Sequence, residues 1–61
     1  MLDRSKLSEH DRRLVEECDK VTNPIDWYLV PDDNEAESPD VKEYLHRRSV
    51  YLYHREEGAW I

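Results

Sequence analysis

The stretch SPDVKEYLHRRSVYLYHREEG, residues 38–58, decides the fold of this chain. Its first residues predict the start of a helix. Ser38 can cap the first turn, Pro39 fits the first helical position, and Asp40 places a carboxylate near the positive end of the helix. The helix therefore begins clearly, and the open question is where it ends.

Two ends are compatible with the residues that follow. In the first, the helix stops near Arg48, and a strand over 49–54 and a short strand over 59–61 form a C-terminal hairpin with a turn at Gly58. In the second, the helix continues to Glu57, and Gly58 is its left-handed C-terminal residue. The two interpretations give different fold classes.

Residues 45–53 contain signals for both a strand and a continued helix. The residues VYLY at 50–53 are β-branched and aromatic and favour a strand, whereas Leu45 and Leu52 keep helical spacing. Upstream, IDWYLV at residues 25–30 lies between two prolines and has the signature of a strand. Because a lone strand leaves its backbone groups without partners, we favour the hairpin interpretation.

A first helix is predicted over residues 8–21. Ser8 can cap it, with Asp11 in the first turn as in a short capping box, and Asn23-Pro24 ends it. Apolar residues fall on one side at helical spacing, namely Leu7, Leu14, Val15, Cys18 and Val21. Two pairs, Glu9–Arg13 and Glu16–Lys20, have the i,i+4 order that supports a helix.

The expected fold class is therefore α+β. We expect one small domain over residues 1–61, in which two helices pack with a small antiparallel sheet that includes the C-terminal hairpin. The alternative is a mainly α domain with two helices around one extended segment. A chain of 61 residues buries only a thin core in either case.

Negative charge is concentrated in the middle of the chain. The net charge is −6, and residues 24–40 carry six acids and no base, whereas the segments before and after them are nearly neutral. The six acids are Asp26, Asp32, Asp33, Glu35, Glu37 and Asp40. A surface that carries only carboxylates predicts a partner with a basic surface.

Catalytic and metal-binding patterns are weak. Cys18 is the single cysteine, lies on the apolar stripe of the first helix, and is expected to be a buried, inert thiol. The single glycine excludes a glycine-rich phosphate loop, and no close His/Cys pair offers a zinc site. Counting Asp32 as the first position of a calcium loop places Ala36 where a ligand belongs. We therefore expect no enzyme, no catalytic residue, no metal and no cofactor.

The expected location is the cytoplasm. No apolar run has the length that a membrane span needs, and the first residues lack the apolar region of a secretion signal. A lone cysteine also fits a reducing compartment. We therefore expect no contact with a membrane.

These features favour a protein-binding module. We expect an inhibitor or regulator that docks the acids of residues 26–40 onto a basic site of a larger protein, including the site of a nucleic-acid-binding protein, where carboxylates would act as a nucleic-acid mimic. Trp60 joins the expected contact residues, because tryptophan often dominates the energetics of interfaces. Phage-encoded inhibitors share this small, acidic character, so a viral origin is one expectation.

Two alternatives use other residues. In the first, the aromatic side chains form a self-interface, and the protein is a homo-oligomeric structural or accessory component. In the second, the segment HRRSVYLYHR at residues 46–55 binds nucleic acid, because basic residues interleaved with tyrosine suit stacking on single strands. The residues of that second alternative are Arg47, Arg48, Tyr51, Tyr53 and Arg55. The net charge of −6 makes direct nucleic-acid binding the weaker expectation.

Overall fold

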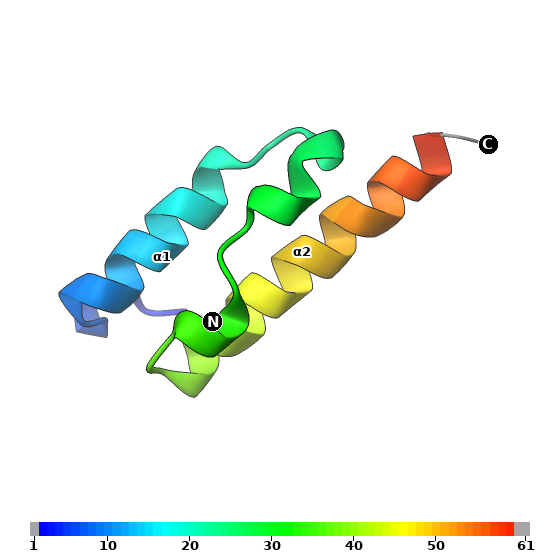
Figure 1. Cartoon of the computed structure of the whole chain (residues 1–61). Helices are drawn as coiled ribbons and strands as arrows, with labels where there is room; N and C mark the ends of the chain where they lie inside the picture. Colours follow the sequence, from blue (N-terminus) through cyan, green and yellow to red (C-terminus); the bar gives the residue numbers. More distant parts are fainter. Residues whose placement is uncertain (1, 60–61) are drawn as a thin grey trace.

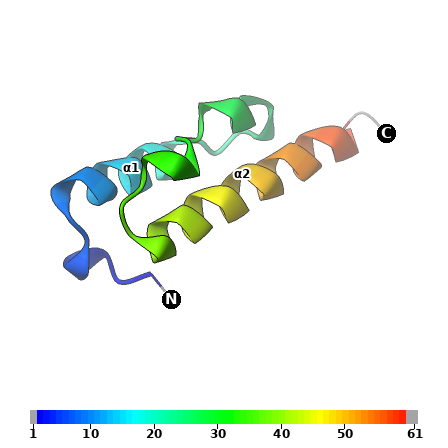
Figure 2. The same ribbon diagram turned by 60° about the horizontal axis from the view of Figure 1, so that its bottom comes forward.

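A computed structural model describes residues 2–59 and is built from two α-helices and three short 3₁₀ helices. The α-helices are α1 (Glu9–Lys20) and α2 (Pro39–Ala59), and they lie side by side and run in the same direction (Figure 1). The linker between them must therefore return along the whole length of α1. It carries η2 (Pro24–Leu29) and η3 (Asp33–Glu35), which lie on one side of the helix pair, while η1 (Arg4–Lys6) lies on the other (Figure 2).

The first predicted helix is confirmed. Its cap is Ser8, whose side chain accepts a hydrogen bond of 3.2 Å from the backbone N–H of Asp11. The pair Glu9–Arg13 is present at 3.7 Å. Lys20 instead bonds Glu17 at 3.2 Å, so the second predicted pair is not the one formed.

The predicted antiparallel sheet and its C-terminal hairpin are wrong. No strand occurs in residues 2–59, and α2 continues through residues 50–53 to Ala59. The helix places Val41, Leu45 and Leu52 on one buried face, each at most 1% exposed. Strand propensity in VYLY depends on packing against neighbouring strands, and packing of this helical stripe overrides it.

Residues 25–30 do not form a strand either, but two 3₁₀ turns. Asn23 caps them, because its side chain accepts from the backbone N–H of Ile25 at 3.1 Å. Backbone bonds from Asp26 to Asn23 and from Val30 to Trp27 satisfy the segment locally. A partner strand is therefore not required, and the reason that favoured the hairpin disappears. The mainly α alternative is the one that fits, with 3₁₀ turns in place of its extended segment.

The end of α2 also differs from the second interpretation, in which the helix stopped at Glu57 with Gly58 as its left-handed C-terminal residue. The helix passes through Gly58 without a positive φ angle, so Gly58 is not a left-handed cap. The start agrees with the prediction, because α2 begins at Pro39 and its first helical hydrogen bond runs from the N–H of Lys42 to the carbonyl oxygen of Ser38 at 3.0 Å.

A buried carboxylate joins the starts of the two α-helices. Asp11 is 2% exposed and is the buried polar residue of the described chain. Its two oxygens accept backbone N–H bonds of 2.9 Å from Glu37 and from Ser38, immediately before α2. These bonds fix where the linker ends and in which direction α2 starts.

An arginine joins the end of α1 to the middle of α2. Arg48 occupies the position on the α2 stripe between Leu45 and Leu52, and its guanidinium donates to the carbonyl oxygen of Val21 at 3.3 Å. A cation at the C-terminal end of α1 is favourable, and the aliphatic stem of Arg48 covers apolar surface.

The second half of α2 extends past the end of α1. The radius of gyration is 11.9 Å, compared with about 10.5 Å for a compact domain of this length. Beyond Arg48, η2 is the element that lies against α2 (Figure 1). No helix within residues 2–59 combines the length and the apolar character that a membrane span needs.

Candidate functional site

The six predicted acids do not form one surface. Asp32 and Asp33 lie beside η2 and line a groove between η2 and α2. Glu37 and Asp40 line a separate hollow near the start of α2, which Leu2 also borders. Asp26 belongs to η2 and Glu35 to η3, while Trp60, the remaining predicted contact, lies outside the described residues.

None of these six carboxylates forms an ion pair within residues 2–59. The ion pairs in this part of the chain use other acids, namely Asp3, Glu9, Glu17, Asp19 and Glu43. The Asp32 side chain accepts only a local bond, from the backbone N–H of Asn34 at 2.9 Å, which caps η3. The charge of the acidic segment is therefore not neutralised by the chain's own arginines and lysines.

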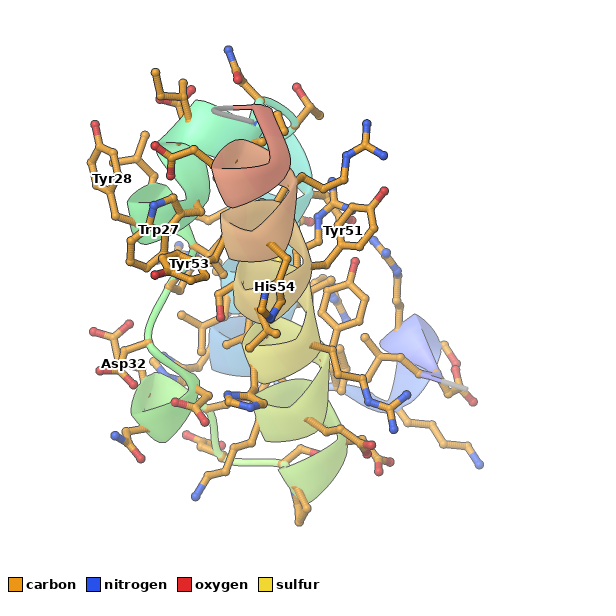
Figure 3. All side chains as sticks on the ribbon, turned by 90° about the vertical axis from the view of Figure 1, so that its right-hand side faces the viewer. Trp27, Tyr28, Asp32, Tyr51, Tyr53 and His54 are labelled. Carbon is orange, nitrogen blue, oxygen red and sulfur yellow. The ribbon has the colours of Figure 1, made fainter. Side chains whose placement is uncertain are left out.

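The groove between η2 and α2, called here the Trp27 groove, combines aromatic and acidic walls. It has a volume of about 360 Å³. Its lining includes Trp27, Tyr28, Asp32, Asp33, Leu45 and His46. Figure 3 shows Trp27, Tyr28 and Asp32 on the same side of α2. Leu45 forms an apolar floor, and the carboxylates of Asp32 and Asp33 lie where the linker leaves η2.

Apolar side chains next to this groove are left open to solvent. Ile25 is 55% exposed, Tyr28 65% and Leu29 57%, which is half of the residues of η2. Full burial of such a side chain stabilises by about 1.5–3 kcal/mol. Contiguous exposed apolar surface is unusual in small monomers and marks interaction sites. Sequence reasoning missed this patch because the same residues were assigned to a half-buried strand.

Aromatic contacts hold the patch against α2. The ring of Trp27 meets that of Tyr53 edge-on at 5.0 Å between centroids, and that of Tyr28 at 6.4 Å. Such edge-to-face pairs have a preferred geometry, so the walls of the groove are pre-formed.

The opposite side of α2 carries arginines that are already engaged. Arg47 pairs with Glu43 at 2.6 Å, and Arg48 bonds α1. The ring of Tyr51 lies between the guanidinium groups of Arg48 and Arg55, at 5.7 and 5.8 Å. Tyr51 and Tyr53 point to different sides (Figure 3). The residues of the nucleic-acid alternative are thus divided between two faces.

A polar cluster anchors η1 to both helices. Asp19 accepts a hydrogen bond from the hydroxyl of Tyr44 and one of 2.6 Å from Arg4. Partial burial opposes the ionisation of Asp19, but the hydrogen bonds from Tyr44 and Arg4 outweigh it and lower the pKa of this carboxyl. Burial and the bond to Asp19 raise the pKa of Tyr44. The cluster is structural, because each group is satisfied within it.

The thiol of Cys18 is buried, as predicted, with no exposed surface. Burial, followed by the neighbouring Asp19, raises its pKa to about 11 from an ordinary value of 9.0. A thiol with a raised pKa carries little thiolate at neutral pH and is a poor nucleophile.

This pKa makes the stability of the protein depend on pH in the alkaline range. The folded state holds the thiol proton more tightly, so the stabilisation is complete below pH 9 and is lost as pH rises toward 11. Urea unfolding should show a loss of about 2 kcal/mol by pH 10.5 in the wild type beyond that in Cys18→Ala. Tyr44 titrates in both proteins, and only the lesser part of its raised pKa that comes from Cys18 remains in this difference. Parallel pH profiles for the two proteins would contradict a buried, protonated Cys18.

Comparisons with known proteins give no further assignment. Neither the family models, nor the curated proteins, nor the solved structures contain a match to this chain. In the described residues no three His, Cys, Asp or Glu side chains are grouped as metal ligands. The candidate binding surfaces are therefore the Trp27 groove on one side of α2 and the arginine-rich side that carries Tyr51.

Proposed function

We propose that this protein is a non-enzymatic binding module of the cytoplasm, an inhibitor or regulator that docks the acidic side of η2 and η3 onto a basic site of a larger protein. The proposal rests on one observation: carboxylates without ion-pair partners in the described chain lie beside exposed apolar side chains. Asp32 and Asp33 line the groove beside the exposed Tyr28, and neither they nor Glu35 of η3 form an ion pair within residues 2–59. Unpaired surface charge beside apolar area is the arrangement that a complementary partner can use.

The side of α2 that carries Arg47 and Arg48 also favours a basic protein, rather than nucleic acid, as the partner. Arg47 forms an exposed pair with Glu43, which contributes little, but Arg48 forms a partly buried hydrogen bond to the carbonyl oxygen of Val21, and an anionic ligand would have to displace it. The acids of the groove have no such competitor in the described chain. We therefore favour binding to a basic protein over binding to nucleic acid.

The test is capture of the partner with a charge-neutralised variant. The variant Asp26→Asn/Asp32→Asn/Asp33→Asn/Glu35→Gln should bind the captured protein about 100-fold more weakly, since each surface charge contributes a fraction of a kcal/mol or more at a basic site. Wild-type affinity should also fall about tenfold between low and moderate salt. Affinity is measured by titration calorimetry with the purified partner.

The matched control removes the same number of negative charges from a different part of the surface. Glu9→Gln/Glu16→Gln/Glu17→Gln/Glu43→Gln neutralises four exposed acids on α1 and α2, outside η2 and η3. This control should bind within about threefold of the wild type, because exposed ion pairs contribute little. Equal weakening of both variants would show that only net charge matters, and unchanged binding by the first variant would refute the acidic docking surface.

A further inference from the structure

The shape and chemistry of the Trp27 groove narrow the class of partner. Resting on the function proposed above, we propose that the groove receives a basic amphipathic α-helix of the partner, whose apolar residues cover Trp27 and Tyr28 and whose lysines or arginines reach Asp32 and Asp33. Each part of this statement follows from a feature of the described residues.

The backbone of the groove offers little to an added strand. Most of the wall is helical, with backbone bonds inside η2, η3 and α2, and the extended residues 30–32 between η2 and η3 include Pro31, which has no N–H to donate. No strand edge is offered anywhere in the part of the chain that the structure describes. A docking segment must therefore satisfy its own backbone, and a helix is the element that does so.

The dimensions of η2 set the length of the docked helix. Six residues of 3₁₀ helix extend about 12 Å at 2.0 Å per residue. A partner α-helix crosses this distance in about two turns, or eight residues. Two or three apolar side chains at i, i+3 and i+4 spacing would then face the groove residues Trp27, Tyr28 and Val30.

The charge at the end of the groove decides between a foreign helix and a second copy of this chain. Asp32 and Asp33 line the groove, so a two-fold contact between two copies would bring like charges together. A head-to-tail contact would use the side of α2 that carries Arg47 and Arg55, but two copies that each have a net charge of −6 still repel. Cationic side chains on a partner helix meet neither obstacle.

A synthetic peptide tests the inference without the natural partner. The probe is a helix of about 14 residues with leucine on one face and lysine on the other, and its control replaces every lysine with glutamate. The protein is the full chain with Trp60→Phe, so that Trp27 is the sole tryptophan and reports contact by fluorescence. The lysine peptide should shift the emission of Trp27 to shorter wavelength and bind at least tenfold more tightly than the glutamate peptide at low salt.

Variants on the surface of the protein locate the contact. Tyr28→Ala and Asp32→Asn/Asp33→Asn should each weaken the lysine peptide at least tenfold, whereas Glu16→Gln/Glu17→Gln, on the exposed side of α1, should stay within twofold. Because Tyr28 is 65% exposed, its loss leaves the fold intact, which circular dichroism checks. Equal binding of the two peptides, or a contact mapped by NMR to Tyr51 on the other side of α2, overturns the inference. Concentration-dependent dimerisation that Tyr28→Ala abolishes also overturns it, in favour of a second copy.

The two proposals can fail separately. If Tyr28→Ala retains the natural partner while the four-acid variant loses it, the acidic docking function stands and the helix-in-groove inference is wrong. If the four-acid variant retains the partner, the proposed function itself is wrong.

Discussion

Asp11→Ala is expected to destabilise the protein by about 3 kcal/mol, which is a large part of its free energy of unfolding. The carboxylate of Asp11 is buried and accepts the backbone N–H groups of Glu37 and Ser38. Without it, two N–H groups lose their acceptors at the start of α2. Loss of a buried hydrogen-bond partner costs about 1–3 kcal/mol, and the combined loss of about 3 kcal/mol approaches the whole stability of a domain of this size, roughly 3–9 kcal/mol.

Urea unfolding followed by circular dichroism at 222 nm measures this effect. The control is Asp40→Ala, which removes an exposed carboxylate from the first turn of the same helix. Its cost should be about 0.5 kcal/mol, the contribution of a charge near the positive end of a helix. A cost below about 1 kcal/mol for Asp11→Ala would show that the linker holds α2 in place by other means.

Leu52→Ala is expected to destabilise the protein by about 2–4 kcal/mol and to loosen the second half of α2. Leu52 is the buried side chain among residues 46–56 and is 1% exposed. Truncation removes its apolar contacts and leaves a cavity, which in core sites costs about 2–5 kcal/mol. Because η2 is the element against which this half of α2 packs, both should lose order together.

Native-state amide hydrogen exchange detects this coupled loss. Amides of residues 50–56 and of η2 should exchange faster in Leu52→Ala, while those of α1 should change less. Val50→Ala is the control, because Val50 is 39% exposed and alanine favours a helix. Its effect should stay within about 0.5 kcal/mol. Uniform acceleration over α1 and α2 would mean that the whole domain opens as a single unit.

The local signals in the sequence located α1 and the start of α2, but not the end of α2. Ser8 is the cap of α1, and α2 begins at Pro39 as its residues indicate. These features depend on short-range chemistry, so a sequence contains them directly. The apolar face of α1 is equally local, since helical spacing fixes which side chains share a side.

The helical state of residues 50–53 and the roles of Arg48 and Asp11 depend on contacts between residues far apart in the sequence. VYLY at residues 50–53 has the propensity of a strand, but Leu52 has a buried site on the helical stripe next to Leu45. The role of Arg48 depends on Val21, 27 positions away, and the role of Asp11 on Glu37, 26 positions away. No spacing rule connects such pairs, and a charged residue inside a helix pattern is ordinarily assigned to the surface.

The candidate site was only partly foreseeable for the same reason. Charge counting found Asp32 and Asp33, which line the Trp27 groove. It also added Asp40, which the start of α2 carries to a different hollow. The exposed residues of η2 were hidden by the assignment of 25–30 as a strand, because 3₁₀ turns and strands place the same residues on different sides.

The separation of charges by α2 gives the molecule a permanent electric dipole. Asp32 and Asp33 line the groove on one side of this helix, and Tyr51, on whose ring Arg55 lies, points to the other side (Figure 3). In the field of a positively charged surface such a molecule experiences a torque that turns its groove toward that surface before they touch. Fewer encounters are then lost to wrong orientations, so the benefit appears in the association rate constant rather than in the lifetime of the complex.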